Sequence, residues 1–163
     1  MCYWFIGGRI LVFSSNLSTV GFGPVHVRDD AKLYNTPNEK NLLQPEKDTY
    51  VKLAEECIKS RVCVDLFFTI PLQRQVDITT LAPLSSLTGG DLNYFMPFDI
   101  AKHGEKLHYL IYRILTRTQG SEVMIKARTS TGITVTEYQG GFGVKEVADF
   151  EIASIDSDKT ISF

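Results

Sequence analysis

The sequence has 163 residues, of which 44% are hydrophobic and 22% are charged, and its formal net charge is −2. These values are typical of a soluble globular protein with one domain, or with one domain and part of a second. The near-neutral charge gives no bulk electrostatic support for nucleic-acid binding. The longest apolar stretch, Met1–Phe13, is interrupted by Gly7, Gly8 and Arg9 and is too short to span a bilayer.

The first predicted element is a strand, Gly8–Ser14, whose apolar residues do not alternate with polar ones. A strand of this kind is typically buried on both faces of a parallel sheet. Because the chain starts almost directly on it, we expect the sequence to be a piece of something longer. An irregular connection follows at residues 15–44, and connections of this length are usually functional or partly disordered.

Residues 53–68 predict the centre of the fold. Pro45 is expected to open a helix, whose apolar face is formed by Tyr50, Leu53, Cys57 and Ile58 at helical spacing. The strand that follows, 62–70, is apolar on both faces. Such a strand lies centrally in a parallel sheet that helices cover on both sides, so the sequence predicts a layered α/β core.

Two more helices and a short strand complete this part. Pro83 argues against one continuous helix after Asp77, so we predict a short turn at 77–81 and a helix that starts at Pro83. A strand at 92–95 follows, and then the longest helix, 100–118. Its predicted apolar stripe is Leu107, Leu110, Ile111, Ile114 and Leu115, with Lys106, Arg113 and Arg117 on the outside.

At Gly120 the pattern changes to a period of two. Residues 123–128 alternate, 129–132 offer a turn, and 133–138 alternate again. This predicts an antiparallel hairpin with one face open to solvent or to a partner. We therefore expect the rear part of an α/β domain at 1–118, followed by the front part of a β domain at 119–163.

Catalytic and metal-binding motifs are not evident. The three histidines are scattered, and His103 and His108 are five residues apart on a helix, so they do not share a face. Cys57 and Cys63 are predicted to be free thiols that pack in the core. Asp65 is the one charge in the central strand, and we interpret it as a hydrogen-bonded structural carboxylate rather than a metal ligand.

Lys126 and Arg128 are the most informative polar pair. Two residues apart on a strand, they point to the same face with roughly 6.6–7 Å of rise between them. This spacing matches two carboxylates presented two residues apart on an extended peptide, to which charge-assisted bonds are strong. The same pattern also fits an ordinary solvated strand face.

Several runs resemble the cargo-adaptor subunit of the COPII inner vesicle coat. They include residues 43–45, 50–57, 62–67 and 84–90, and residues 7–13 and 135–138 also look like that family. The resemblance implies the rear half of a trunk domain with a von Willebrand A-like fold, then the start of an antiparallel β-sandwich, with the boundary near Thr118. It implies a non-enzymatic protein, and we expect no cofactor. We also expect no metal, because the family's zinc-binding module and the first strand on which a von Willebrand A-like fold often carries a metal have no counterpart in this sequence.

The resemblance also implies a site and partners. In this family a basic pocket, where the trunk meets the β-sandwich, binds acidic sorting signals of the Asp-x-Glu type, and two of its basic residues correspond to Lys126 and Arg128. Lys126 departs from the more usual Arg and so loses the bidentate fork. The implied partners are cargo sorting-signal peptides and the GTPase-activating subunit of the same coat. The implied location is the cytosolic face of the endoplasmic reticulum and of COPII vesicles, peripheral to the membrane.

Two other functions remain open from the residues. The GTPase-activating subunit of the same coat shares the architecture, although no matching arginine element is seen. A doubly wound α/β enzyme would need a convergent catalytic set, which these residues do not provide. We further expect either self-association or an extra N-terminal segment packed over the sheet, since a sheet cut at the strand 8–14 would expose an unpaired edge and apolar faces.

Overall fold

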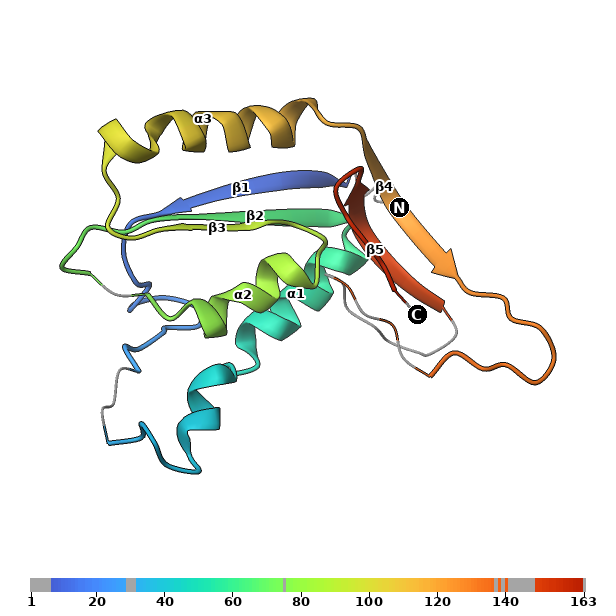
Figure 1. Ribbon diagram of the computed structural model, residues 1–163, viewed down its shortest axis with the longest axis horizontal. Coiled ribbons are helices and arrows are strands. Elements are labelled where there is room, and N and C mark those ends of the chain that lie inside the picture. Colours follow the sequence, from blue (N-terminus) through green and yellow to red (C-terminus); the bar gives the residue numbers. More distant parts are fainter. Residues whose placement is uncertain are drawn as a thin grey trace, which may run out of the picture.

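The computed structural model describes residues 7–28, 32–74, 76–136, 138, 140 and 149–162. Within this part of the chain, three parallel strands form one sheet in the order β1 (Gly8–Ser14), β2 (Val62–Thr69) and β3 (Leu92–Phe95). One face of the sheet is covered by α1 (Thr49–Lys59) and α2 (Ile78–Ser86), and α3 (Ile100–Thr116) lies over the other (Figure 1). The predicted layered α/β core is confirmed.

A second, antiparallel sheet lies beyond one end of this layered part (Figure 1). It consists of β4 (Gln119–Lys126) and β5 (Asp149–Asp156), which pair from Gln119 opposite Asp156 to Lys126 opposite Asp149. The expected change from α/β to antiparallel structure is therefore also confirmed.

The central strand β2 is buried along almost its whole length, as its apolar sequence predicts. Because side chains alternate along a strand, Val64, Leu66 and Phe68 share one face. They form the main core with Leu17, Val25, Ile70 and Leu81, against which α1 and α2 pack. Cys63, Asp65 and Phe67 lie on the opposite face.

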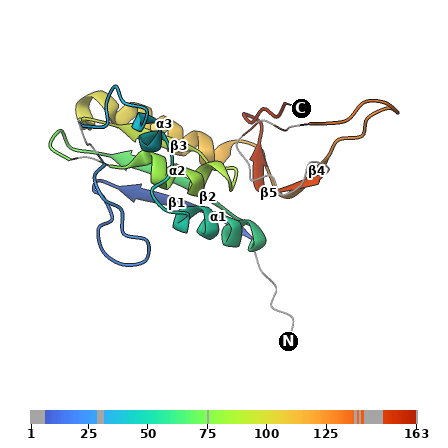
Figure 2. The ribbon, with the colours of Figure 1, turned by 90° about the horizontal axis from the view of Figure 1, so that it is seen from below.

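The first strand, β1, has the predicted bounds and, as expected for this part of the sheet, an unpaired edge, but it is not buried on both faces. It pairs with β2 alone among the described strands and lies at the margin of the sheet (Figure 2). Ile10 is 50% exposed and Phe13 is 53% exposed, although Phe13 stacks on Phe67. An apolar run without alternation thus belongs here to an edge strand.

Two helix predictions need correction. The first helix begins at Thr49 rather than near Pro45, and a separate 3-10 helix, η1 (Glu39–Leu43), lies within the long connection. α2 is a single helix with Pro83 inside it, not a turn followed by a helix. The start of α2 is fixed by Asp77, whose carboxylate accepts a hydrogen bond from the Thr80 amide at 3.2 Å.

A buried anchor explains why Pro83 does not interrupt α2. Arg28 donates two hydrogen bonds to the carboxylate of Asp77, at 2.6 and 2.9 Å. Leu81 and Ser85, on either side of Pro83, are buried against the core. This anchoring and burial offset the hydrogen bond that proline removes.

The last helix ends at Thr116, two residues before its predicted end, because Arg117 has an extended backbone with ψ of 151°. Of the predicted apolar stripe only Ile114 is buried, and Leu115 is largely exposed. Arg117 was predicted to lie outside, but its side chain is only 8% exposed.

The predicted hairpin between residues 123–128 and 133–138 is wrong, because β4 pairs with β5. The turn itself is present, since the Ile133 amide donates to the Ser130 carbonyl at 3.1 Å and Gly132 has a φ of +94°. Val135 and Tyr138 still pack against Ile152 of β5. The alternating pattern in 133–138 thus reflects packing against the sheet rather than membership of it.

Candidate functional site

The predicted basic pair lies at and just beyond the end of β4, on the exposed side. Ile125 and Ala127 pack against the core of the second sheet, whereas Lys126 and Arg128 between and after them are exposed. Lys126 is the last residue of β4, and Arg128 lies two residues beyond its end. The alternation places both cations on the outer face, at a spacing of roughly 6.6–7 Å along the strand.

A cavity of about 200 Å³ lies on this side, where the corner between α1 and β2 meets β4 and β5. Met124, two residues before Lys126, lines it together with Ile58, Lys59, Arg61, Glu122, Val123, Glu151, Ile152 and Ala153. Lys126 and Arg128 do not line it. The structure therefore brings the pair to the strand that borders the cavity, but not into the cavity.

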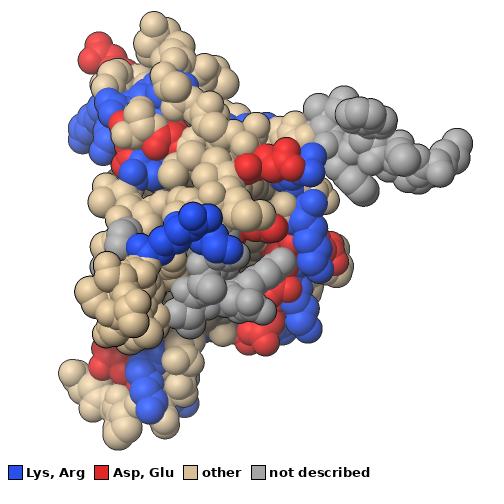
Figure 3. Space-filling model, turned by 90° about the vertical axis from the view of Figure 1, so that its right-hand side faces the viewer, with Lys and Arg blue, Asp and Glu red and all other residues tan. Residues whose placement is uncertain are grey.

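The same side of the molecule carries charges of both signs. Figure 3, seen from the side of β4 and β5, shows Lys and Arg interspersed with Asp and Glu rather than a patch of one sign. An exposed contact joins the layered part to the second sheet on this side: Arg61, at the corner after α1, forms an ion pair with Glu122 of β4. The side chains of this pair are 46% and 60% exposed.

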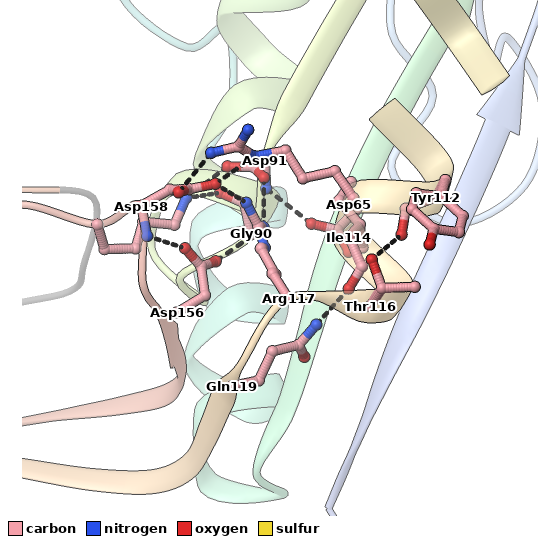
Figure 4. Close-up of polar contacts among 12 residues, drawn as sticks. Asp65, Gly90, Asp91, Tyr112, Ile114, Thr116, Arg117, Gln119, Asp156 and Asp158 are labelled. Carbon is pink, nitrogen blue, oxygen red and sulfur yellow. Dashed lines mark hydrogen bonds and ion pairs between the residues drawn. The ribbon is translucent and has the colours of Figure 1, made fainter. Parts of the chain in front are cut away.

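Behind this face, a buried ion cluster fastens the two sheets together (Figure 4). Arg117, directly after α3, contacts carboxylates of Asp91 at 2.6 Å and Asp156 at 2.7 Å. It also contacts Asp158 at 3.2 Å, and Lys159 reaches Asp91 at 2.5 Å. Since Asp156 ends β5 and Asp91 precedes β3, the cluster fixes the second sheet on the first.

A second buried pair lies next to it. Arg9 of β1 contacts the carboxylate of Asp65 at 2.8 Å, and the Asp91 amide donates to the same carboxylate at 2.8 Å. The interpretation of Asp65 as a hydrogen-bonded structural carboxylate is confirmed. Arg9 also approaches Asp156 to 3.8 Å, so the two pairs are continuous.

The pKa values of these groups follow their surroundings. Burial raises the pKa of Asp65, and the Asp91 amide and Arg9 only partly offset it. Burial also acts to raise the pKa of Asp91, but hydrogen bonds from Lys159 and Arg117 outweigh it, and the pKa is lowered. The hydrogen bond from Arg113 lowers the pKa of Asp158 to about 2. At neutral pH the cluster therefore holds ionised Asp91 and Asp158.

The remaining candidates for chemistry have structural surroundings. Cys63 is buried and Cys57 half-buried, and burial raises the pKa of both thiols, which disfavours the reactive thiolate. His103 lies at the start of α3, where its Nδ1 accepts a hydrogen bond from the Asp99 amide at 3.1 Å. Among the residues that the structure describes, no three His, Cys, Asp or Glu side chains are grouped as metal ligands would be.

Sequence reasoning missed the ion cluster, although part of its signal is visible. Arg9 and Asp65 are single charges within apolar strands, and a buried charge needs a partner. Nothing local indicates that Arg117 pairs with Asp156, because 39 positions separate them in the chain. The Arg61–Glu122 pair was missed for the same reason.

Within the described residues, no helix has the length and hydrophobicity needed to cross a membrane.

Comparisons with known proteins agree on one family. The model of the Sec23/Sec24 trunk domain matches residues 1–115. Human protein transport protein Sec24C is 35% identical over 156 residues, and the alignment covers 95% of this chain but 14% of that protein. Arabidopsis thaliana protein transport protein SEC24 B is 36% identical over 159 residues, and that alignment covers 95% of this chain and 14% of that protein. This chain thus spans about one seventh of the relatives' length.

The fold agrees with a solved structure of the same kind. The crystal structure of the human COPII-coat protein Sec24c superposes with a TM-score of 0.88 at 35% identity, covering 95% of this chain and 21% of that chain. The family match covers most of the chain, and the similarity continues through the second sheet. The chain therefore belongs to the Sec23/Sec24 trunk family, and the relatives it resembles are Sec24 proteins.

Proposed function

We propose that this chain is a non-enzymatic, cargo-selecting part of a COPII coat subunit that captures acidic sorting signals for transport from the endoplasmic reticulum to the Golgi. The observation that carries the proposal is the pair of exposed cations, Lys126 at the end of β4 and Arg128 just beyond it, in a chain similar to Sec24 proteins. The Sec24 relatives favour this function over that of the GTPase-activating subunit.

The chemistry of the pair fits an extended acidic peptide. Carboxylates two residues apart on a strand-like peptide have the same spacing as Lys126 and Arg128. Arg128 offers a planar fork for one carboxylate, and Lys126 a compact charge for the other. The exposed outer face of β4 lets such a peptide lie along the strand, as in other complexes that recognise extended segments.

The proposal extends to partners and location. It places the chain on the cytosolic face of the endoplasmic reticulum and COPII vesicles, peripheral to the membrane, in a complex with the GTPase-activating subunit of the coat. It divides the chain into a trunk part at 1–118 and a β-sandwich part at 119–163. The end of α3 at Thr116, the start of β4 at Gln119 and the family match over 1–115 support this division. A separate part of the proposal is self-association through β1.

A peptide titration tests the site. A fluorescent peptide that carries Asp-x-Glu is titrated against the wild-type chain and a Lys126→Ala/Arg128→Ala variant by fluorescence anisotropy. We expect the double variant to lose at least about tenfold in affinity, because two charge-assisted contacts are removed. The wild-type affinity should also fall as salt is raised, because both cations are exposed.

Two controls make the result specific. Lys102→Ala/Lys106→Ala removes two exposed cations from α3, on the other side of the sheet, and should leave binding unchanged. A peptide with Asn-x-Gln in place of Asp-x-Glu should not bind. Equal binding of the acidic peptide by the wild type and the Lys126→Ala/Arg128→Ala variant would refute the assignment of these residues.

A further inference from the structure

The Arg61–Glu122 ion pair has an unusual backbone at both ends. The φ angles are 59° at Arg61 and 57° at Glu122, a left-handed conformation that residues other than glycine rarely adopt. The left-handed conformation of Arg61 is explained by its place after α1, since helices commonly end in this conformation. Glu122 lies within β4, where no such reason applies. Its backbone conformation accompanies a side chain that reaches Arg61 across the junction.

The pair is accessible to a ligand. Both side chains are about half exposed, and both line the cavity of about 200 Å³ at the junction. An exposed ion pair gains little free energy, because water screens its charges. A carboxylate that arrives from solvent can therefore take the place of Glu122 on Arg61 at little cost.

The pair also lies in line with the proposed peptide-binding residues. Glu122, Met124, Lys126 and Arg128 are all exposed, whereas the residues between them are half-buried. Glu122 precedes Lys126 by four residues, which is roughly 13 Å along a strand. Arg61 thus adds a third cation to the row formed by Arg128 and Lys126.

We propose that Arg61 is a third cation of this face and that Glu122 occupies it in the free protein, in place of a ligand carboxylate. This inference rests on the proposed function and names its ligand class more closely. The ligand is an extended acidic peptide with a third carboxylate four residues beyond the Asp-x-Glu pair. Binding exchanges the carboxylate of Glu122 for that of the ligand, so Glu122 weakens binding and selects for peptides with the third acid.

Designed peptides and a matched pair of variants test the proposal. The heptapeptides Asp-Ala-Glu-Ala-Ala-Ala-Glu and Glu-Ala-Ala-Ala-Asp-Ala-Glu place the third acid four residues after or before the Asp-x-Glu pair and so cover both chain directions, and each has a control with Gln in place of its distant Glu. Glu122→Gln is compared with Glu151→Gln, which removes the same charge from the same cavity but does not contact Arg61 in the described structure. Affinities are measured by fluorescence anisotropy at low salt.

The expected results separate the roles of the three side chains. Glu122→Gln should tighten binding of the three-acid peptide about two- to fivefold, which is the effect of removing one exposed competing ion pair. Glu151→Gln should change it by clearly less. Arg61→Gln should reduce the affinity for the three-acid peptide to that for its Gln control. Glu122→Asn is a second charge-free variant, because Asn tolerates a positive φ better than most residues.

The outcomes distinguish this inference from the proposed function. If the three-acid and Gln-control peptides bind the wild type equally, or if both Glu122 variants behave like Glu151→Gln, Arg61 is not a ligand contact and the inference is overturned. Loss of binding in the Lys126→Ala/Arg128→Ala variant would still support the proposed function in that case. If no acidic peptide binds the folded wild-type chain, both proposals are wrong.

Discussion

At the scale of single residues, Arg117 is the charge on which the junction depends. Its side chain is 8% exposed and contacts three carboxylates, one of which, Asp156, is fully buried. A buried ion pair contributes little compared with apolar residues that pack equally well, but removing one partner leaves the other charge without compensation. The cost of losing Arg117 should therefore greatly exceed that of losing an exposed arginine.

Replacing Arg117 tests this reasoning. We expect Arg117→Met to lower the free energy of unfolding by about 3 kcal/mol, because Asp156 remains buried and loses its nearer counter-charge, with only Arg9 left at 3.8 Å. Arg113→Met is the matched control, since Arg113 contacts Asp158 at the surface of the same cluster. Its effect should be much smaller. Urea denaturation followed by circular dichroism measures both, and equal effects of the two variants would contradict a special role for Arg117.

At the scale of elements, the turn between α2 and β3 lies directly against β5. Gly89 has a φ of +79°, and a Cβ atom there would collide with the carbonyl oxygen of Ser154 and the side chain of Ile152 on β5. The adjacent Gly90 approaches the carbonyl of Val64 on β2 in the same way. Only glycine satisfies both requirements at Gly89, the left-handed backbone and the close approach.

A pair of glycine variants separates these two requirements. Gly132 also has a positive φ, +94°, but a Cβ atom there would meet open space. Gly132→Ala should cost about 1 kcal/mol in unfolding free energy, from the backbone conformation alone. Gly89→Ala should cost clearly more, because β5 must also move away from the turn. Thermal denaturation of the two variants measures the difference, and similar costs would mean that β5 is not held against this turn.

The elements that sequence reasoning predicted correctly are those that local pattern determines. β2 is recognised by its apolar run, and both β2 and the short strand β3 lie where expected. The partner of β4 was wrong because strand pairing depends on residues far away in the chain, and 133–138 has a suitable alternation without joining the sheet. The single helix α2 was missed because the Arg28–Asp77 contact that stabilises its start joins positions 49 residues apart.

The candidate site, too, can be predicted from the sequence only where local pattern determines it. The shared face of Lys126 and Arg128 follows from strand alternation, which any sequence displays directly. The position of the third cation does not follow from the sequence pattern, because Arg61 reaches β4 only through tertiary structure. The left-handed conformation of Glu122 carries no sequence signal either, since the position has neither glycine nor asparagine.

At the scale of the whole molecule, β1 leaves one edge of the parallel sheet without a partner among the described strands. β1 pairs on one side with β2 and has no other partner among the described strands. Edge strands are usually protected by charged residues or proline. The only charge in β1 is Arg9, which is turned inward to Asp65, while Ile10, Val12 and Phe13 are exposed. Such an edge favours pairing with another strand.

We therefore expect the chain to self-associate, with two copies of β1 pairing about a two-fold axis. Ile10→Lys should shift the population towards monomer, because a lysine at the edge opposes strand pairing. Val20→Lys is the matched control, since it adds the same charge to a loop residue that is 86% exposed. Light scattering across a concentration series measures the mass. A wild-type chain that remains monomeric at the highest concentration would show that this edge does not pair, and equal effects of the two lysines would indicate a different interface.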